Sequence, residues 1–221
     1  MSLRIAIGVA VCVLSAIAQP LPQFMGRRVT IDKPAVDDSG MFPEGSATVC
    51  VEGPPQRQCF KFPDEIGLDA TARIVQVRKG FPALFFSARS GGVSGWRVMF
   101  ALLRPGQGKE LENLFPYECE VSSQSEHAFW SEPSISDALI FVTATYVWGP
   151  DESHFVSHRF MISAFLLKRT QEGIAGEKYY LQDRYMTVRK YDVEQDDVLA
   201  TEKPEILRRL RKVAEYQKTT P

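Results

Sequence analysis

Residues 139–167 read LIFVTATYVWGPDESHFVSHRFMISAFLL, and this stretch decides the fold class. Two runs rich in Val, Ile, Thr, Phe and Tyr flank the break Gly149 to Ser153, which has the composition of a turn. Such side chains suit a pleated, half-buried surface. The stretch therefore predicts two antiparallel strands, over residues 139–148 and 154–167, joined by a short connection.

Shorter runs of the same character lie on both sides of this pair. They predict further strands at residues 48–51, 59–62, 72–78, 83–88, 96–103, 127–130 and 179–191, and either a short strand or a turn of helix at residues 111–115. Turn signals separate them at intervals of about 8–12 residues, and no repeat of fixed period is present. We expect an all-β protein, mainly an antiparallel sandwich or a partly open barrel.

One amphipathic α-helix is expected at the C-terminal end, over about residues 202–217. Thr201 can cap its first turn, and Pro204 suits that turn because the amide there has no helical partner. Apolar side chains then recur at helical spacing, at Ile206, Leu207, Leu210, Val213 and Ala214. This stripe predicts that the helix packs against a sheet.

The N-terminal segment, residues 1–18, has the pattern of a cleavable signal peptide. Arg4 precedes an apolar run over residues 5–17, and Ala16 and Ala18 form a small-x-small cleavage site. The pattern predicts a secreted or periplasmic protein whose mature chain starts at Gln19. The alternatives are a membrane anchor, for which the run is short, and a lipid on Cys12, which lies inside the apolar run.

Proline is concentrated in the first third of the chain. Seven of the fourteen prolines lie between Pro20 and Pro63, and proline neither donates to a strand ladder nor continues a helix. We therefore expect a Pro-rich irregular N-terminal arm over residues 19–46. A single β-rich domain is expected over residues 47–221.

Charge and hydropathy exclude two classes of partner. The formal net charge is −1, and it becomes −2 once residues 1–18 are removed. Nucleic-acid binding requires a dense basic face, so nucleic acid is not expected as a partner. Later apolar runs, such as residues 138–142 and 162–167, have the length of strands, so no stable membrane insertion is expected.

The mature chain contains three cysteines, and two of them fit a disulfide. Cys50 and Cys59 flank a turn-like segment. If residues 48–51 and 59–62 pair as a hairpin, both sulfurs lie on one face, as a cross-strand bridge requires. An exported protein normally keeps such a pair oxidised. We predict a Cys50–Cys59 disulfide and a buried Cys119, with a reactive or intermolecular Cys119 as the alternative.

The histidines do not support a zinc site. His154 and His158 are four residues apart, and on a strand their side chains are separated by about 13 Å. This distance is too large for one tetrahedral ion with bonds of about 2 Å. No metal site is predicted here.

The acidic connector after residue 191 is a weak calcium candidate. Asp192, Glu194 and Asp196 alternate as in the first half of a calcium loop. Asp197 stands where that loop needs glycine, and Lys203 stands where it needs a bidentate Glu. An acidic connector into the helix is the preferred interpretation, so neither a metal nor any other cofactor is expected.

No catalytic residues are predicted. The glycine-rich tip at residues 90–95 is followed by a predicted strand, whereas phosphate loops and serine nucleophile elbows lead into a helix. A dispersed triad could use His127, His154 or His158, but sequence spacing neither supports nor excludes one.

Three tryptophans are the remaining candidates for a site. Trp96, Trp130 and Trp148 lie next to turns or strand ends, where exposed aromatic rings can form a ligand platform. The alternative is that each ring closes one end of the core. The preferred function is therefore a non-catalytic binding module for an unknown protein, glycan or envelope component. A secreted hydrolase with dispersed catalytic residues and a structural envelope protein are the alternatives, and the oligomeric state is left open.

Overall fold

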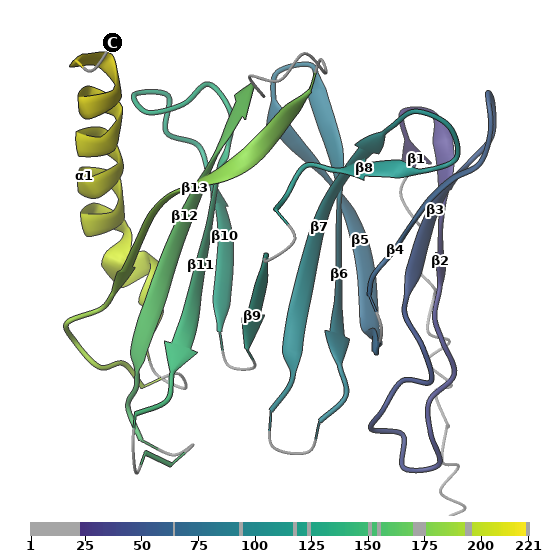
Figure 1. Ribbon diagram of the computed structural model, residues 1–221, viewed down its shortest axis with the longest axis horizontal. Helices are drawn as coiled ribbons and strands as arrows, with labels where there is room; N and C mark the ends of the chain where they lie inside the picture. The colour runs from purple at the N-terminus through teal and green to yellow at the C-terminus, as the bar shows by residue number, and fades with distance from the viewer. Residues whose placement is uncertain are drawn as a thin grey trace, which may run out of the picture.

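Three antiparallel sheets and a helix are stacked in successive layers (Figure 1). The computed structural model describes residues 23–63, 65–92, 95–116, 119–122, 125–149, 152–153, 156–169, 176–192 and 196–219. The order of the layers is the N-terminal sheet, the central sheet, the third sheet and the helix.

Each sheet is built mainly from strands that follow one another in the chain. The N-terminal sheet has the order β1 (Gln23–Phe24), β2 (Arg27–Asp32), β3 (Thr48–Glu52) and β4 (Gln58–Lys61). The central sheet contains β5 (Ile66–Arg78), β6 (Phe81–Ser90), β7 (Arg97–Pro105) and β8 (Leu111–Asn113), and β9 (Glu120–Ser122) also pairs with β7. The third sheet contains β10 (Glu126–Trp130), β11 (Ile140–Val147), β12 (Arg159–Arg169) and β13 (Glu177–Met186). The helix is α1 (Val198–Thr219).

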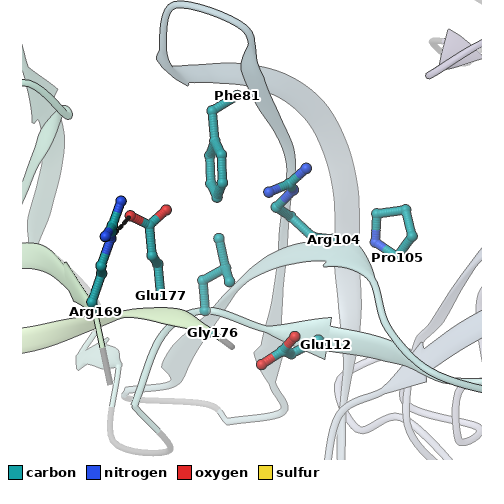
Figure 2. A pocket seen from close by; sticks show the side chains of 8 residues that line it. Phe81, Arg104, Pro105, Glu112, Arg169, Gly176 and Glu177 are labelled. Atoms are coloured by element: carbon teal, nitrogen blue, oxygen red, sulfur yellow. Dashed lines mark ion pairs between the residues drawn. The ribbon is translucent and has the colours of Figure 1, made fainter. Parts of the chain in front are cut away.

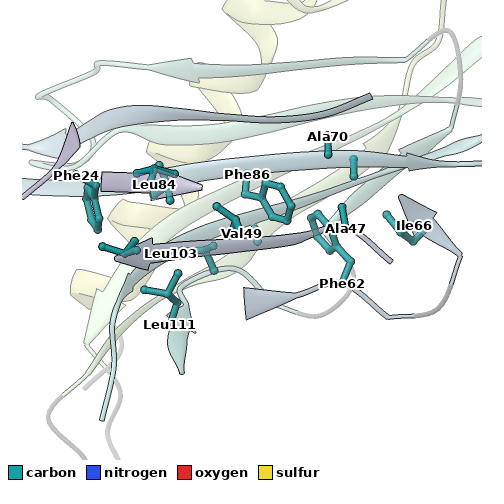
Figure 3. Close-up of a cluster of buried hydrophobic side chains, with 14 residues drawn as sticks. Phe24, Ala47, Val49, Phe62, Ile66, Ala70, Leu84, Phe86, Leu103 and Leu111 are labelled. Atoms are coloured by element: carbon teal, nitrogen blue, oxygen red, sulfur yellow. The ribbon is translucent and has the colours of Figure 1, made fainter. Parts of the chain in front are cut away.

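The central sheet is buried on both faces, which explains the nearly continuous apolar run of β6. Side chains alternate along a strand, so Leu84 and Phe86 enter the core shared with the N-terminal sheet. Figure 3 shows this core, with Phe86 beside Phe62 and a ring-centroid distance of 4.7 Å. Ala83 and Phe85 enter a second core, which lies between the central and third sheets.

The third sheet is also covered on both faces. Phe141 and Phe165, which are register partners on β11 and β12, point toward the central sheet. On the opposite face of the sheet, Ile140 and Val142 pack against Ile206 and other residues of α1. The amphipathic stripe therefore packs against a sheet, as predicted.

The predicted fold class is confirmed: the protein is mainly antiparallel β-sheet with a C-terminal helix, and its sheets do not close into a barrel within the described residues. Two segments of the opening stretch form the antiparallel pair β11–β12, and the second strand starts at Arg159, five residues later than predicted. The prediction fails to identify strands β1, β2 and β9, and it starts β5 six residues late.

The expectation of an irregular arm over residues 19–46 is wrong for residues 23–32. β2 contains no proline and pairs with β3 from Arg28↔Glu52 to Asp32↔Thr48. Val29 of β2 is fully buried in the core between the N-terminal and central sheets. Pro22 and Pro34 lie on either side of this strand. The proline content of the whole segment therefore gave a wrong prediction for the proline-free residues between them. Residues 33–46 contain an isolated bridge, Val36↔Pro43, but no strand.

The predicted start of the helix is also wrong. α1 begins at Val198, and Pro204 lies in its second turn instead of its first. Two carboxylates permit the earlier start. Asp197 accepts a hydrogen bond from the Ala200 amide at 2.8 Å, and Glu126 of β10 accepts bonds from the first two amides of the helix.

Residues 1–18, the predicted signal peptide, lie outside the described residues. Among the residues that are described, no helix is long and apolar enough to cross a membrane.

Candidate functional site

A cavity of about 520 Å³ opens at the edge of the core between the central and third sheets (Figure 2). We call it the arginine pocket, and its side-chain walls come from β6, β7, β8, the residue after β8, β12 and β13. The residues that line it are Phe81, Arg104, Pro105, Glu112, Leu114, Arg169, Gly176 and Glu177.

Arg104 of β7 is the central feature of the arginine pocket. Its guanidinium carbon lies 3.7 Å from the centroid of the Phe81 ring, a cation–π contact. Its Nε atom is buried and has no hydrogen-bond partner. Figure 2 shows the guanidinium directed toward Phe81 and well separated from the carboxylate of Glu112.

The carboxylates around the pocket are engaged by other cations. Glu177 accepts two hydrogen bonds from Arg78, at 3.1 and 2.6 Å, and lies 3.8 Å from the Nε of Arg169. Glu112 is the cross-strand neighbour of Arg104, yet its carboxylate pairs with Lys178 at 3.8 Å. Among the described residues, no carboxylate lies within ion-pair distance of Arg104.

The electrostatics of Arg104 follow from this arrangement. Burial lowers the pKa of the Arg104 guanidinium, and the positive charge of Arg78 lowers it further, against the opposing attraction of Glu177 and Glu112. The side chain still carries a positive charge at neutral pH, because arginine starts from a very high pKa. An anion bound in the pocket would supply Arg104 with a negatively charged partner.

The chemistry available here is recognition of an anion. A guanidinium presents a planar fork of N–H donors that matches carboxylate, sulfate and phosphate oxygens. Among the described residues that line the pocket there is no Ser, Thr, Cys or His side chain. Its walls provide two arginines, two glutamates that pair with other cations, an aromatic ring and apolar side chains, a mixture of polar groups and apolar surface that is usual in binding sites.

Two of the predicted tryptophans lie at the same end of the molecule. Trp96 directly precedes β7 and Trp148 directly follows β11, and β9 lies against both strands near these positions. Both rings are partly exposed, at 37% and 45%. Trp96 packs under Arg89 and Trp148 packs against Tyr146. A platform formed by these two rings stays a prediction.

Trp130 lies elsewhere. It ends β10 opposite Ile140 at the start of β11, so it is at the far end of that strand from Trp148. Its ring contacts Lys203 of α1 at 5.1 Å and lines an open cavity of about 820 Å³. The structure therefore does not bring the three predicted rings together.

The calcium candidates are only partly described. Glu194 lies outside the described residues, while Asp196 pairs with Arg189 at 3.0 Å and accepts a hydrogen bond from the Asp192 amide. Within the described part of the chain, no three His, Cys, Asp or Glu side chains are placed to hold a metal ion. The interpretation of this segment as an acidic connector into the helix stays a prediction.

The histidines form no described triad. The Nδ1 of His158 lies 3.0 Å from Glu152, but its Nε2 is buried without a partner. The ring of His127 lies 4.5 Å from that of Phe100. His154 lies outside the described residues. For the two histidines that are described, no hydroxyl or thiol is within hydrogen-bond distance.

The cysteine predictions are confirmed. Cys50 and Cys59 are register partners on β3 and β4 and form a disulfide, with 4.1 Å between their Cα atoms. Cys119 is a buried free thiol, and burial raises its pKa well above the ordinary value. This environment favours the packing role over the reactive one.

Sequence analysis did not identify the arginine pocket. Arg78, Arg104 and Arg169 are far apart in the chain and belong to three different strands. The one local signal is the position of Arg104 directly after residues 100–103 of β7, which are buried. An arginine that continues an apolar strand is a candidate for a partly buried charge. Comparison of the chain with protein-family models, with curated proteins and with solved structures gives no match.

Proposed function

We propose that this protein is an exported, non-catalytic binding module that takes an anionic group of its ligand into the arginine pocket. The observation that carries the proposal is the Arg104 guanidinium, which stacks on Phe81 beside an open cavity and has no carboxylate partner among the described residues. Natural proteins seldom bury part of a charged group without pairing it, so a missing partner indicates a ligand.

The energetics support an anion as that partner. A hydrogen bond to a charged group contributes about 1.5–3 kcal/mol. Phe81 holds the guanidinium plane in place, so little conformational entropy is lost when the ligand binds. The acidic group can belong to a glycan, a peptide or another envelope component, since all three can carry carboxylates.

Export is supported by two independent features. Residues 1–18 have the pattern of a secretory leader. The Cys50–Cys59 disulfide joins adjacent strands of the N-terminal sheet, and disulfides persist mainly in oxidising compartments.

The test is titration with simple anions, observed at the arginine Nε–H signals in NMR spectra. Sodium acetate and sodium sulfate should shift the Arg104 signal in a saturable manner, whereas sodium chloride at equal ionic strength should not. Arg104→Met keeps an unbranched apolar side chain and removes the guanidinium, together with its NMR signal, so this variant is followed by calorimetry, which should detect no binding of acetate or sulfate. Arg97→Met, on the same strand but with Arg97 paired to Glu120 at 3.5 Å, is the matched control. Equal, non-saturating shifts at every arginine would contradict the proposal.

A further inference from the structure

A second cavity lies on the other side of β8. Its volume is about 830 Å³, and it runs between β4 of the N-terminal sheet and the β8 segment. Its wall is largely apolar, with Phe60, Met99, Leu111 and Phe115 among the lining side chains. We call it the phenylalanine groove. Its size is within the range of about 300–1,000 Å³ that is usual for small-ligand sites.

The phenylalanine groove and the arginine pocket are adjacent and have one lining residue in common. Glu112 lines both cavities, and it is the register partner of Arg104. On β13, Glu177 faces the pocket and Lys178 faces the groove, because consecutive side chains of a strand point to opposite sides. A single ligand can therefore reach both cavities by crossing the edge of β8.

Lysines slightly outnumber glutamates along the groove. Lys61, Lys109 and Lys178 line it, together with the acidic Glu110 and Glu112. Lys178 pairs with Glu112, whereas Lys61 and Lys109 form no ion pair with the described residues. The apolar wall and the positive rim are complementary to an apolar body that carries a negative charge at one end.

We propose that the ligand is an amphipathic organic anion, with its acidic group at Arg104 and its apolar body in the phenylalanine groove. This inference rests on the proposed function and adds the ligand class. The two cavities supply different parts of such a site: the arginine pocket supplies the Arg104 guanidinium, and the groove supplies the larger apolar wall, with no arginine among its described lining residues.

Three probes separate the two cavities: acetate carries the charge alone, octan-1-ol carries the chain alone, and octanoate carries both. Binding is followed by NMR at the Arg104 Nε–H and at the methyl group of Met99, which lines the groove. Met25 and Met41 are exposed at 54% and 41%, outside both cavities, and serve as internal controls.

We expect octanoate to shift Arg104 and Met99 with one common Kd, at least about tenfold below that of acetate, because burial of the chain adds to the affinity. Octan-1-ol should bind at least about tenfold more weakly than octanoate. Arg104→Met should raise the octanoate Kd about tenfold, and Arg97→Met should leave it unchanged.

Each other outcome has a definite meaning. If acetate and octanoate shift Arg104 with equal Kd and Met99 does not respond, the proposed function stands and this inference is overturned. If octan-1-ol binds as tightly as octanoate, the groove is an independent apolar site and the inference is again overturned. If neither anion shifts Arg104, both proposals fail. These wild-type measurements remain decisive even if a variant does not fold.

Discussion

The Nδ1 atom of His158 lies 3.0 Å from Glu152 Oε2, and this contact anchors the connection between β11 and β12. The imidazole is fully buried and lies against Tyr146 and Trp148, with ring centroids 5.2 and 5.3 Å away. The same carboxylate binds Lys190 at 2.6 Å. A single acidic group thus links a buried histidine to the segment that follows β13.

Glu152→Gln should destabilise the protein at neutral pH. The hydrogen bond from Lys190, and further bonds from the Gly149 amide and His158, lower the pKa of Glu152 to about 2 from its ordinary 4.5. A carboxyl with a lowered pKa stabilises the folded state above its unfolded pKa, and this contribution is lost as the pH falls toward 2.

The measurement is urea denaturation of wild type and variant between pH 7 and pH 2. The difference in unfolding free energy should be largest above pH 5 and should decline toward pH 2. Glu44→Gln, in the exposed 33–46 loop, is the control and should show no such trend. A difference that is constant over the whole pH range would refute the electrostatic explanation.

Glu126→Gln should destabilise the docking of α1. The carboxylate of Glu126 accepts hydrogen bonds from the Val198 and Leu199 amides, both at 2.8 Å, and its negative charge lies at the positive end of the helix dipole. Loss of the charge should cost about 1 kcal/mol, since capping contributions are of that order. Thermal unfolding followed at the helical circular-dichroism band measures the effect. Glu120→Gln removes a charge from β9 that is partly exposed and pairs with Arg97 at 3.5 Å, and it should cost less than half as much.

The Glu126 cap also shows why the helix boundary could not be predicted from sequence. Periodicity identified the apolar stripe correctly, because Ile206 and Leu210 repeat within the helix itself. The start depends on a side chain 72 residues away in the chain. The error over residues 23–32 has a similar origin, because β2 is defined by its pairing with β3 and not by its local composition.

The strands of residues 139–167 were predictable for the opposite reason. Both partners of the β11–β12 pair are adjacent in sequence and rich in β-branched and aromatic residues, so local information suffices. The Cys50–Cys59 disulfide was likewise encoded within one hairpin. The arginine pocket was not predictable. Its defining property is that Arg104 has no carboxylate partner among the described residues, and only the tertiary structure shows which cations the carboxylates of Glu112 and Glu177 contact.

Removal of the disulfide should destabilise the N-terminal sheet. The bridge closes a loop with a sequence separation of nine residues between β3 and β4. In the chain-entropy model, such a loop contributes about 2.7 kcal/mol. The double variant Cys50→Ala with Cys59→Ala should lose about this much in urea denaturation. Dithiothreitol should produce a similar loss in the wild type and none in the double variant. Sensitivity of the double variant to the reductant would show that another thiol is involved.

Gly67→Ala should displace the 33–46 loop from the start of β5. A Cβ atom at Gly67 would lie 2.3 Å from the ring of Pro34 and 2.9 Å from both the Gly45 carbonyl oxygen and Pro43, distances at which atoms must move. Overpacking of this kind costs about 1–3 kcal/mol. Gly45→Ala is the matched control, because its Cβ would meet Pro34 at an ordinary 3.6 Å. Limited proteolysis and urea denaturation should show faster cleavage within residues 33–46 and lower stability for Gly67→Ala alone. If both variants behave as wild type, the loop does not depend on Gly67, and the close packing of Pro34 against β5 does not contribute to stability.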